Sequence, residues 1–373
     1  MKKKVLAAIM AAAFILTGCG GEDKDSSSIP PLEPVIIDET SEPTSEAPDE
    51  SESESQQEPE EEENHEGMYR SEITNEWIDE ELKDQRPIAV MIDNEKKALP
   101  HYGLTEADVV YEIMNSTLNG RITRLMAIVK DWGKIEQMGS IRSTRSTNIP
   151  LAAEWNAVLC HDGGPFYVDE WIAKDYCDNF SGTFGRVTNG KDWEFTEYIL
   201  TGDLEKNFDS TGYSREYNKH YPGEHFQFSD TEIDLTGESG AKDCTELQLP
   251  FPHNKSTLKY DEGTGTYDYY EYGEAHLDPQ HDNAQLTFKN LLIQSCSFSQ
   301  LDDGGYMIYN LIGSGSGYYI TGGKAVEVTW SKSGETSPTV FYKKGTNEEI
   351  QLNTGKTYIS LVPSDSWSDI VIK

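Results

Sequence analysis

RPIAVMIDNEKKALPHYGLTEADVVYEI, residues 86–113, is the stretch that decides the fold class of this chain. Its first apolar run, PIAVMID at 87–93, is short and uninterrupted, and it predicts a buried strand. LTEADVVYEIMN, residues 104–115, predicts a helix capped by Thr105. ITRLMAIVK, residues 122–130, predicts a second strand. Strands separated by helices are typical of an α/β layer with a mostly parallel or mixed sheet.

The same alternation continues towards the middle of the chain and then stops. A helix from about residue 148 to 155 and a strand in AVLCHDGG, residues 157–164, are predicted next. From LTFKNLLIQS, residues 286–295, onward, short apolar runs are separated by Gly, Asn and Ser turns. We therefore expect an α+β or α/β protein with an N-terminal mixed-sheet α/β domain over residues 70–228, a connecting segment over 229–256, and a smaller, mostly β domain over 257–373.

The N-terminus has the features of a bacterial export signal. Residues 1–18 contain three lysines and an apolar run that is too short to span a bilayer permanently, which predicts a lipoprotein signal peptide. LTGC, residues 16–19, resembles the lipobox of bacterial lipoproteins, in which Cys19 is diacylated and becomes the new N-terminus. The alternatives are an ordinary secretory peptide and a membrane helix. We expect a lipid on Cys19 that holds the protein at the outer face of the bacterial cytoplasmic membrane.

Residues 19–69 differ in composition from the rest of the chain. Residues 20–67 contain 18 acidic residues and one basic residue, Lys24, without apolar periodicity. Such a segment cannot bury enough apolar surface to offset the entropy of ordering, so residues 19–69 are predicted to be a disordered acidic linker. Metal or partner binding by its glutamates is the alternative to a solvated spacer. The whole chain has 66 acidic residues against 31 basic ones, which disfavours nucleic acid as a partner.

SIRSTRSTN, residues 140–148, stands out from this acidic background. The chain has eight arginines, and four of them lie within 25 residues: Arg121, Arg124, Arg142 and Arg145. The last two follow an expected strand and precede a predicted helix start, where backbone N–H groups and guanidinium groups together attract anions. Arginine also binds carboxylate or phosphate through two parallel hydrogen bonds. We predict an anion-binding site; the alternative is ion pairing with the protein's own carboxylates, first Glu112 and then Asp108 and Asp93.

Further polar residues are candidates for the same site. His161 and Asp162 lie at the end of an expected strand, where ligands of α/β sheets collect. His161 could act as a general acid or base, or it could be a hydrogen-bonded structural residue. Arg215 and His225, in the stretch 212–226, could close over the arginines or cap a loop.

Metal and covalent chemistry have weaker support. The eight histidines show no H-x-x-x-H or H-E-x-x-H spacing and no cysteine pair has C-x-x-C spacing, so we predict no metal site. LIGSGSGYYITGG, residues 311–323, precedes a β-run without a helix, so we predict no dinucleotide and no other cofactor. A disulfide between Cys160 and Cys177 is one interpretation of the cysteines, and free buried thiols at these positions and at Cys244 and Cys296 are the other.

Several motifs carry a family resemblance. They are the stretch 86–113, GRITRLMAIV (120–129), GSIRSTR (139–145), LTFKNLLIQ (286–294), LIGSGSGYYITGGKAVEVTWSK (311–332) and LNTGKTYISLVP (352–363). Together they resemble the YerB-like bacterial lipoproteins, a family of extracytoplasmic proteins defined as a domain of unknown function in two parts. Arg142, Arg145, His161, Gly163 and Gly164 keep the family's places, whereas Asp162 departs from its HAGG pattern. The resemblance implies a location and an architecture, and it implies no reaction.

A fainter resemblance links the arginines to the LytR-CpsA-Psr phosphotransferases, in which arginines beside a strand hold a lipid pyrophosphate. Near Arg124, however, no carboxylate stands at the strand start where that family would hold magnesium. We therefore expect a membrane-anchored extracytoplasmic lipoprotein that binds an anionic or peptide ligand of the cell envelope, or a partner protein, at its arginines. The alternative is a cell-envelope enzyme, such as a phosphotransferase acting on a lipid-linked pyrophosphate.

Overall fold

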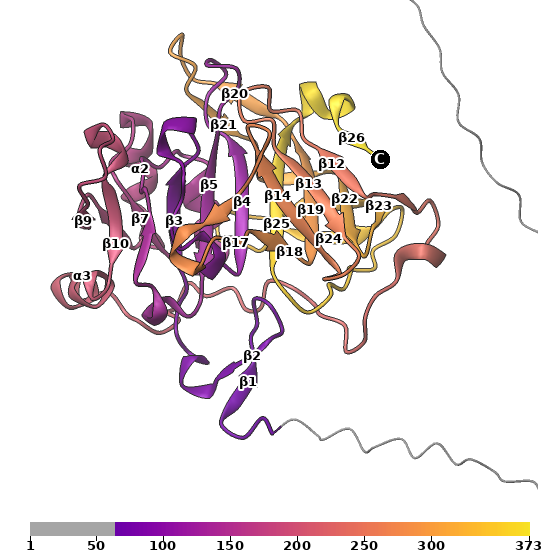
Figure 1. Cartoon of the computed structure of the whole chain (residues 1–373), viewed down its shortest axis with the longest axis horizontal. Coiled ribbons are helices and arrows are strands. Elements are labelled where there is room, and N and C mark those ends of the chain that lie inside the picture. Colours follow the sequence, from indigo (N-terminus) through magenta and orange to yellow (C-terminus); the bar gives the residue numbers. More distant parts are fainter. Residues whose placement is uncertain (1–63) are drawn as a thin grey trace, which may run out of the picture. The chain divides into compact units, whose positions relative to one another are not determined.

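The computed structural model describes residues 64–373. The predicted signal peptide, the Cys19 anchor and most of the predicted linker lie outside the described residues. The main feature is an 11-stranded sheet (Figure 1). In order across the sheet its strands are β11 (Lys242–Asp243), β23 (Lys324–Lys332), β22 (Gly313–Thr321), β19 (Asn290–Cys296), β25 (Thr357–Pro363), β4 (Val109–Met114), β5 (Thr123–Val129), β3 (Ile88–Asp93), β7 (Val158–His161) and β8 (Asn179–Ser181), and β24 (Val340–Lys343) pairs with β23.

The main sheet is mixed, as the sequence predicts. β3 pairs with β5 in antiparallel orientation and with β7 in parallel orientation. β25 lies between β4 and β19 and runs parallel to both. Figure 1 shows the indigo and magenta strands of the N-terminal part continuing into the orange and yellow strands of the C-terminal part. Both parts of the chain therefore contribute strands to one sheet.

The α-helices of the described chain belong to its N-terminal part. They are α1 (Asn148–Ala153), α2 (Asp169–Ile172) and α3 (Asp203–Thr211). The same part contains the strand pair β1 (Met68–Arg70) and β2 (Trp77–Asp79), and a small sheet of β6 (Gln137–Gly139), β10 (Glu197–Leu200) and β9 (Gly185–Arg186). This is the predicted mixed-sheet α/β part, and its β1 strand begins slightly before residue 70.

The C-terminal part is mostly β, as expected. A second sheet contains β15 (Glu274–Ala275), β14 (Thr266–Glu271), β13 (Thr257–Asp261), β12 (Glu246–Gln248), β26 (Val371–Ile372) and β18 (Thr287–Phe288). Two further pairs are β16 (Leu277–Asp278) with β17 (Ala284–Gln285), and β20 (Phe298–Gln300) with β21 (Met307–Tyr309). The limits of 70–228, 229–256 and 257–373 remain a proposal as domain limits, since the main sheet runs through both parts.

One predicted helix is wrong. Residues 104–115 form a short 3-10 helix, η3 (Leu104–Glu106), followed by β4. Every residue of β4 is buried, and β4 lies between β5 and β25 in the sheet. The run Val109, Val110 and Tyr111 is of the β-branched and aromatic type that favours strands. Thr105 does not cap a helix, and its hydroxyl instead donates to the carboxylate of Asp278 at 2.7 Å.

The other predicted elements near the site are present. β3 and β5 are fully buried strands, and α1 begins at Asn148 as predicted. The predicted disulfide is absent: Cys160, Cys177, Cys244 and Cys296 are free, so the second interpretation of the cysteines holds. Cys160 is fully buried on β7, and burial raises the pKa of its thiol.

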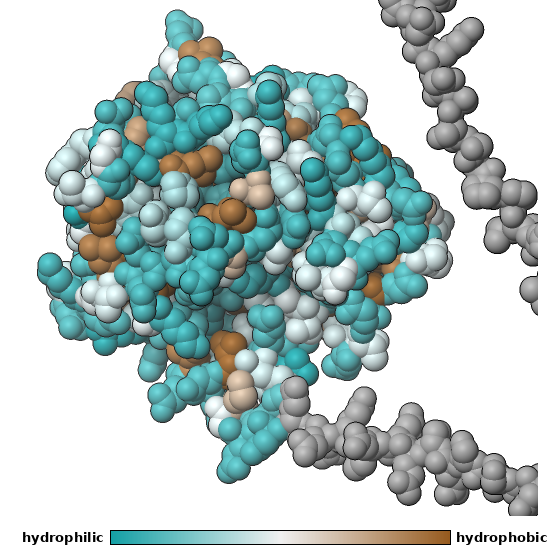
Figure 2. Space-filling view, viewed as in Figure 1, coloured by the Kyte–Doolittle hydropathy of each residue, from teal (hydrophilic) through white to brown (hydrophobic). Residues whose placement is uncertain are grey.

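Figure 2 shows one face of the described residues, on which hydrophilic side chains predominate and hydrophobic ones form small separate patches. Within residues 64–373, no helix has the length and apolar character that crossing a membrane requires.

Candidate functional site

The site is built where β3 ends and β5 begins. Asp93, the last residue of β3, is the cross-strand partner of Arg124 on β5. The segment after β6 crosses the same edge, because the N–H of Arg142 donates to the carbonyl of Met91 at 2.9 Å. It is also held to the end of β7, since the N–H of Asp162 donates to the carbonyl of Arg142 at 3.1 Å. Backbone pairing thus brings together side chains that three separate elements supply.

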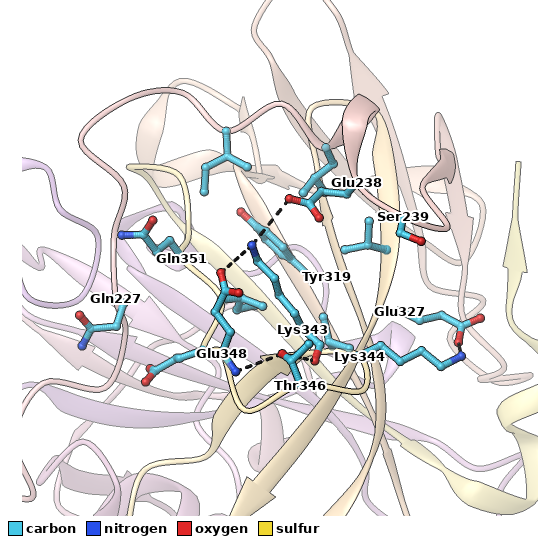
Figure 3. Close-up of a pocket in the computed structure, with 16 residues that line it drawn as sticks. Gln227, Glu238, Ser239, Tyr319, Glu327, Lys343, Lys344, Thr346, Glu348 and Gln351 are labelled. Carbon is cyan, nitrogen blue, oxygen red and sulfur yellow. Dashed lines mark hydrogen bonds and ion pairs between the residues drawn. The ribbon is translucent and has the colours of Figure 1, made fainter.

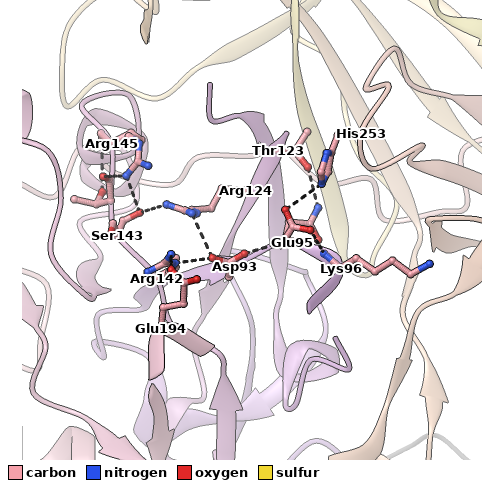
Figure 4. Close-up of polar contacts among 12 residues, drawn as sticks. Asp93, Glu95, Lys96, Thr123, Arg124, Arg142, Ser143, Arg145, Glu194 and His253 are labelled. Carbon is pink, nitrogen blue, oxygen red and sulfur yellow. Dashed lines mark hydrogen bonds and ion pairs between the residues drawn. The ribbon is translucent and has the colours of Figure 1, made fainter. Parts of the chain in front are cut away.

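The carboxylate of Asp93 is the centre of this arrangement (Figure 4). Its Oδ2 accepts from Nε of Arg142 at 2.7 Å and lies 3.4 Å from a terminal nitrogen of Arg124. Arg142 also pairs with the half-exposed carboxylate of Glu194. Asp93 and Arg124 are 3% and 7% exposed, so this ion pair is shielded from water. Burial lowers the pKa of Arg124, and the Asp93 carboxylate opposes that shift.

Arg145 joins the other two arginines without a carboxylate of its own in the described chain. Its terminal nitrogen donates to the carbonyl of Thr144 at 2.8 Å, and its guanidinium lies 5.3 Å from the ring centre of Tyr306. Its buried Nε has no hydrogen-bond partner. Burial, and then the nearby Arg124 guanidinium, lower the pKa of Arg145 to about 9. We refer to Arg124, Arg142 and Arg145 as the arginine cluster.

Arg121 lies outside the cluster. It has a positive φ of 58°, and its two terminal nitrogens bind the two carboxylate oxygens of Asp365 at 2.7 and 2.6 Å. Asp365 is half-exposed and lies in η9 (Ser364–Asp369), which follows β25. The structure therefore brings together three of the four arginines that the sequence singles out, and the fourth forms a surface ion pair.

Glu112 does not pair with any arginine, so the first partner expected from the sequence is wrong. It is fully buried on β4, and its carboxylate accepts hydrogen bonds from four hydroxyl groups. The donors are Thr123, Ser256, Tyr269 and Tyr358. Burial raises the pKa of Glu112, although the hydroxyl donors act against the shift. The arginine partner is Asp93, which was the third of the expected carboxylates.

Both ring nitrogens of His161 lie close to hydrogen-bond acceptors. Its Nδ1 lies 2.8 Å from the carbonyl of Gly163, and its Nε2 lies 3.2 Å from Oδ1 of Asn179. Burial lowers the pKa of His161. The ring therefore fixes the turn that follows β7, which is the turn that holds the arginine-bearing segment in place.

Asp162 pairs with Arg186, an arginine outside the four that the sequence singles out. Arg186 lies 2.8 Å from the carboxylate of Asp162 and 2.8 Å from that of Glu197. Its guanidinium lies 4.1 Å from the ring centre of Trp193. Burial, followed by the neighbouring Asp162, raises the pKa of Glu197 to about 7. No short motif links Arg186 to residues 142–145; the pairing of β9 with β10 brings it there.

Exposed aromatic rings flank the arginine cluster. Trp193 is 72% exposed and covers Arg186, while Phe166 is 71% exposed and lies 3.9 Å from Tyr167 between ring centres. Tyr167 in turn lies 6.0 Å from Tyr306, which contacts Arg145. Exposed rings beside cationic side chains suit contact with sugar or peptide groups that carry a negative charge.

Arg215 and His225 lie apart from the cluster. Arg215 donates to Oδ1 of Asp209 in α3 at 2.7 Å. His225 stacks on Trp155 with 4.0 Å between ring centres, and its Nε2 lies 3.6 Å from buried Glu154. Burial opposes ionisation of Glu154, but Lys332 and then His225 outweigh burial and hold the pKa of Glu154 below its usual range. Neither predicted residue contacts Arg124, Arg142 or Arg145 in the described chain.

A groove of about 700 Å³ lies elsewhere, over β22, β23 and β24 (Figure 3). Its lysine Lys343 lies 2.7 Å from Glu348 and 3.8 Å from Glu238, and Lys344 pairs with Glu327. Both lysines thus have carboxylate partners, and none of the residues of the arginine cluster lines the groove.

Comparison with known proteins identifies both parts of the chain. The family model described as "Protein of unknown function (DUF3048) N-terminal domain" matches residues 73–214, and the corresponding C-terminal domain model matches residues 247–359. The Bacillus subtilis (strain 168) protein named "Putative lipoprotein YerB" is 25% identical over 307 residues, which cover 79% of this chain and 86% of that protein.

The solved structures give the same relationship at the level of the fold. The crystal structure of the YerB protein from Bacillus subtilis matches with a TM-score of 0.69 at 22% sequence identity. The match covers 82% of this chain and 99% of that chain. Two family models in the same order, a curated relative named as a lipoprotein and a shared fold agree with one another: the chain belongs to the YerB-like family.

Proposed function

We propose that this protein is a membrane-anchored extracytoplasmic lipoprotein that captures an anionic ligand of the cell envelope at the arginine cluster. A diacylated Cys19 would hold it at the outer face of the cytoplasmic membrane, and the acidic segment would keep the folded part away from the bilayer. Support for the location comes from the signal-like residues 1–18 and from the name of the YerB relative.

Arg145 carries the proposal, because it has no carboxylate partner in the described chain. Arg124 and Arg142 share Asp93, and Arg142 also has Glu194, whereas Arg145 has no carboxylate partner within residues 64–373. Its Nε is buried without a hydrogen-bond partner. A partly buried cation next to two other cations is destabilising unless an anion neutralises it. An oxyanion bound at Arg145 and Arg142 would supply both the missing charge and the missing acceptor.

The surroundings favour a particular class of ligand. Trp193 and Phe166 offer exposed rings beside the cationic groups. A sugar or peptide unit that bears a phosphate or carboxylate would contact both the rings and the guanidinium groups. A phosphotransferase has less support, because the central carboxylate, Asp93, already accepts hydrogen bonds from Arg142 and Arg124 instead of facing a magnesium ion.

The experiment is a binding titration of the full-length protein, solubilised in detergent, with inorganic pyrophosphate and then with soluble envelope fragments. Arg145→Gln should weaken binding by about 10-fold or more, the equivalent of losing a charged hydrogen bond of about 1.5–3 kcal/mol. Arg215→Gln is the matched control, because Arg215 is an exposed arginine that pairs with Asp209 far from the cluster, and it should bind as the wild type does. Equal binding by Arg145→Gln and the wild type would overturn the proposal.

A further inference from the structure

Three buried side chains meet at a second place, behind the end of β3. His101 lies in the loop between η2 (Lys96–Ala98) and η3, Glu271 is the last residue of β14, and His276 precedes β16. The three residues are 0%, 2% and 3% exposed, respectively. One potential ligand atom from each lies within 4.8 Å of those from the other two.

Each of these side chains has one buried polar atom without a hydrogen-bond partner. The three atoms are His101 Nδ1, His276 Nε2 and Glu271 Oε2. Leaving a buried polar atom unsatisfied costs about 1–3 kcal/mol, so three on neighbouring side chains need an explanation. A bound cation that accepts a lone pair from His101 Nδ1 and another from the Glu271 carboxylate would satisfy two of the three.

The contacts of His101 and His276 indicate which nitrogen of each ring can bind an ion. His101 Nε2 lies 2.5 Å from the backbone oxygen of Asp93, which is an acceptor, so this nitrogen carries the proton and leaves a lone pair on Nδ1. His276 Nδ1 lies 2.8 Å from Oε1 of Glu271, and these two atoms are close enough to bind one ion together through their lone pairs. His101 has the arrangement of a metal-binding histidine, whose other N–H characteristically donates to a carbonyl or a carboxylate.

The charge of the surroundings also favours a cation. Glu271 forms no ion pair with lysine or arginine in the described chain; its partner is His276. A second buried carboxylate, Glu112, is bound by hydroxyl groups alone. The ring of Tyr269, one of those hydroxyl donors, lies 5.6 Å from the ring of His276 between centres. Two carboxylates thus lie within one buried region, and within residues 64–373 neither forms an ion pair with lysine or arginine.

We propose that His101, Glu271 and His276 bind a divalent transition-metal ion of the zinc class. Two imidazole nitrogens and one carboxylate oxygen are a ligand set that zinc accepts, with a fourth position left for another donor. Calcium and magnesium prefer oxygen ligands, so they fit this set poorly. The sequence predicts no metal site because its histidines lack the spacing of a short metal-binding motif. Such spacing cannot reveal this site, because His101 lies far from Glu271 and His276 in the sequence. The proposal therefore replaces the earlier prediction.

The metal would fasten the two family segments to each other. His101 belongs to the segment matched by the N-terminal family model, and Glu271 and His276 belong to the C-terminal one. Hydrogen bonds already join the two segments beside these three side chains. The carboxylate of Asp278 accepts from the N–H groups of Gly103 at 2.9 Å and Thr105 at 3.0 Å. A metal at this junction is therefore expected to stabilise the whole folded region.

The test uses full-length protein that has been treated with a chelator, desalted and titrated with Zn²⁺. The wild type should bind about one zinc ion per chain, and saturating zinc should raise its melting temperature by several degrees. Glu271→Gln, which preserves shape but removes the charge, should weaken zinc binding by about 10-fold or more and abolish the increase in melting temperature. His281→Gln is the matched control, because His281 is partly exposed and pairs with Glu106.

A measurement on the wild type alone covers the case in which a variant does not fold. Co²⁺ added to the chelated protein should produce the visible absorption of a four- or five-coordinate site with nitrogen ligands. The proposal fails if the wild type shows neither zinc-dependent stabilisation nor this spectrum, since His276 and Glu271 would then form an ordinary buried hydrogen bond. It also fails if folded Glu271→Gln binds zinc as the wild type does, because the ion would then lie elsewhere.

Discussion

The backbone oxygen of Asp93 lies 2.5 Å from Nε2 of His101. The carboxylate of the same residue accepts from Nε of Arg142 at 2.7 Å. The last residue of β3 thus contacts a buried histidine through its main chain and the arginine cluster through its side chain. A displacement of this strand end would alter both sets of contacts together, so the two sites are physically adjacent although they use different chemistry.

The first prediction concerns the stability that Asp93 provides. Asp93→Ala should lower the free energy of unfolding by about 3–5 kcal/mol, because it leaves the buried Arg124 without its carboxylate. Asp365→Ala removes the partner of half-exposed Arg121 and should cost about 1 kcal/mol or less. Urea denaturation of the two variants measures the difference, and equal losses would contradict the assignment of Asp93 as the central counter-ion.

A different outcome is expected for Arg145. Because Arg145 has no carboxylate partner in the described chain and lies near Arg124, Arg145→Gln should leave the free energy of unfolding within about 0.5 kcal/mol of the wild type or increase it. Thermal melting of the unliganded protein is the measurement. A loss of about 2 kcal/mol or more would mean that Arg145 is a structural residue, whatever the binding assay shows.

Anion binding should depend on pH through Glu197. Burial and the neighbouring Asp162 raise the pKa of Glu197 to about 7, so Glu197 gains a proton as the pH falls through that value. Protonation removes a negative charge from the surroundings of Arg186, and affinity for an anion should increase from pH 8 to pH 6. Sulfate is a suitable probe because its charge is constant over this range. Glu197→Gln should bind sulfate with the same affinity at both pH values.

A second pH effect concerns stability alone. Burial raises the pKa of Asp108 from its ordinary 3.8 to about 7, while the N–H of Lys130 opposes the shift. The folded state therefore binds a proton that the unfolded state releases, and this contribution to stability is present below pH 4 and is lost as the pH rises to about 7. The slope should be at most about 1.4 kcal/mol per pH unit. Asp108→Asn should remove it in urea denaturation at a series of pH values.

The sequence predicts the strands near the site better than it predicts the site itself. Uninterrupted apolar runs identify β3 and β5, since both are buried on two faces. The run at 109–114 satisfies helical and strand spacing equally, and Glu112 within it is typical of the polar face of a helix. Its neighbours in the sheet decide that this run forms a strand. One of them, β25, lies far away in the sequence.

The contacts of the arginine cluster could not be predicted for a similar reason. Composition reveals an excess of arginine between residues 121 and 145, but it does not reveal which carboxylate each arginine meets. Asp365 reaches Arg121 from beyond β25, and Glu194 reaches Arg142 from the 3-10 helix η6 (Trp193–Phe195). Such partners depend on tertiary folding, and no local pattern of residues encodes them.

The place of β25 in the main sheet has a consequence for biosynthesis. The strand that joins the two halves of the sheet is formed by residues 357–363, so β4 and β19 have no neighbour on that side until those residues have been made. Pairing between such distant segments slows folding, and open strand edges invite pairing with other molecules. In the interval before Thr357–Pro363 is available, the edges of β4 and β19 are therefore open to pairing with other molecules.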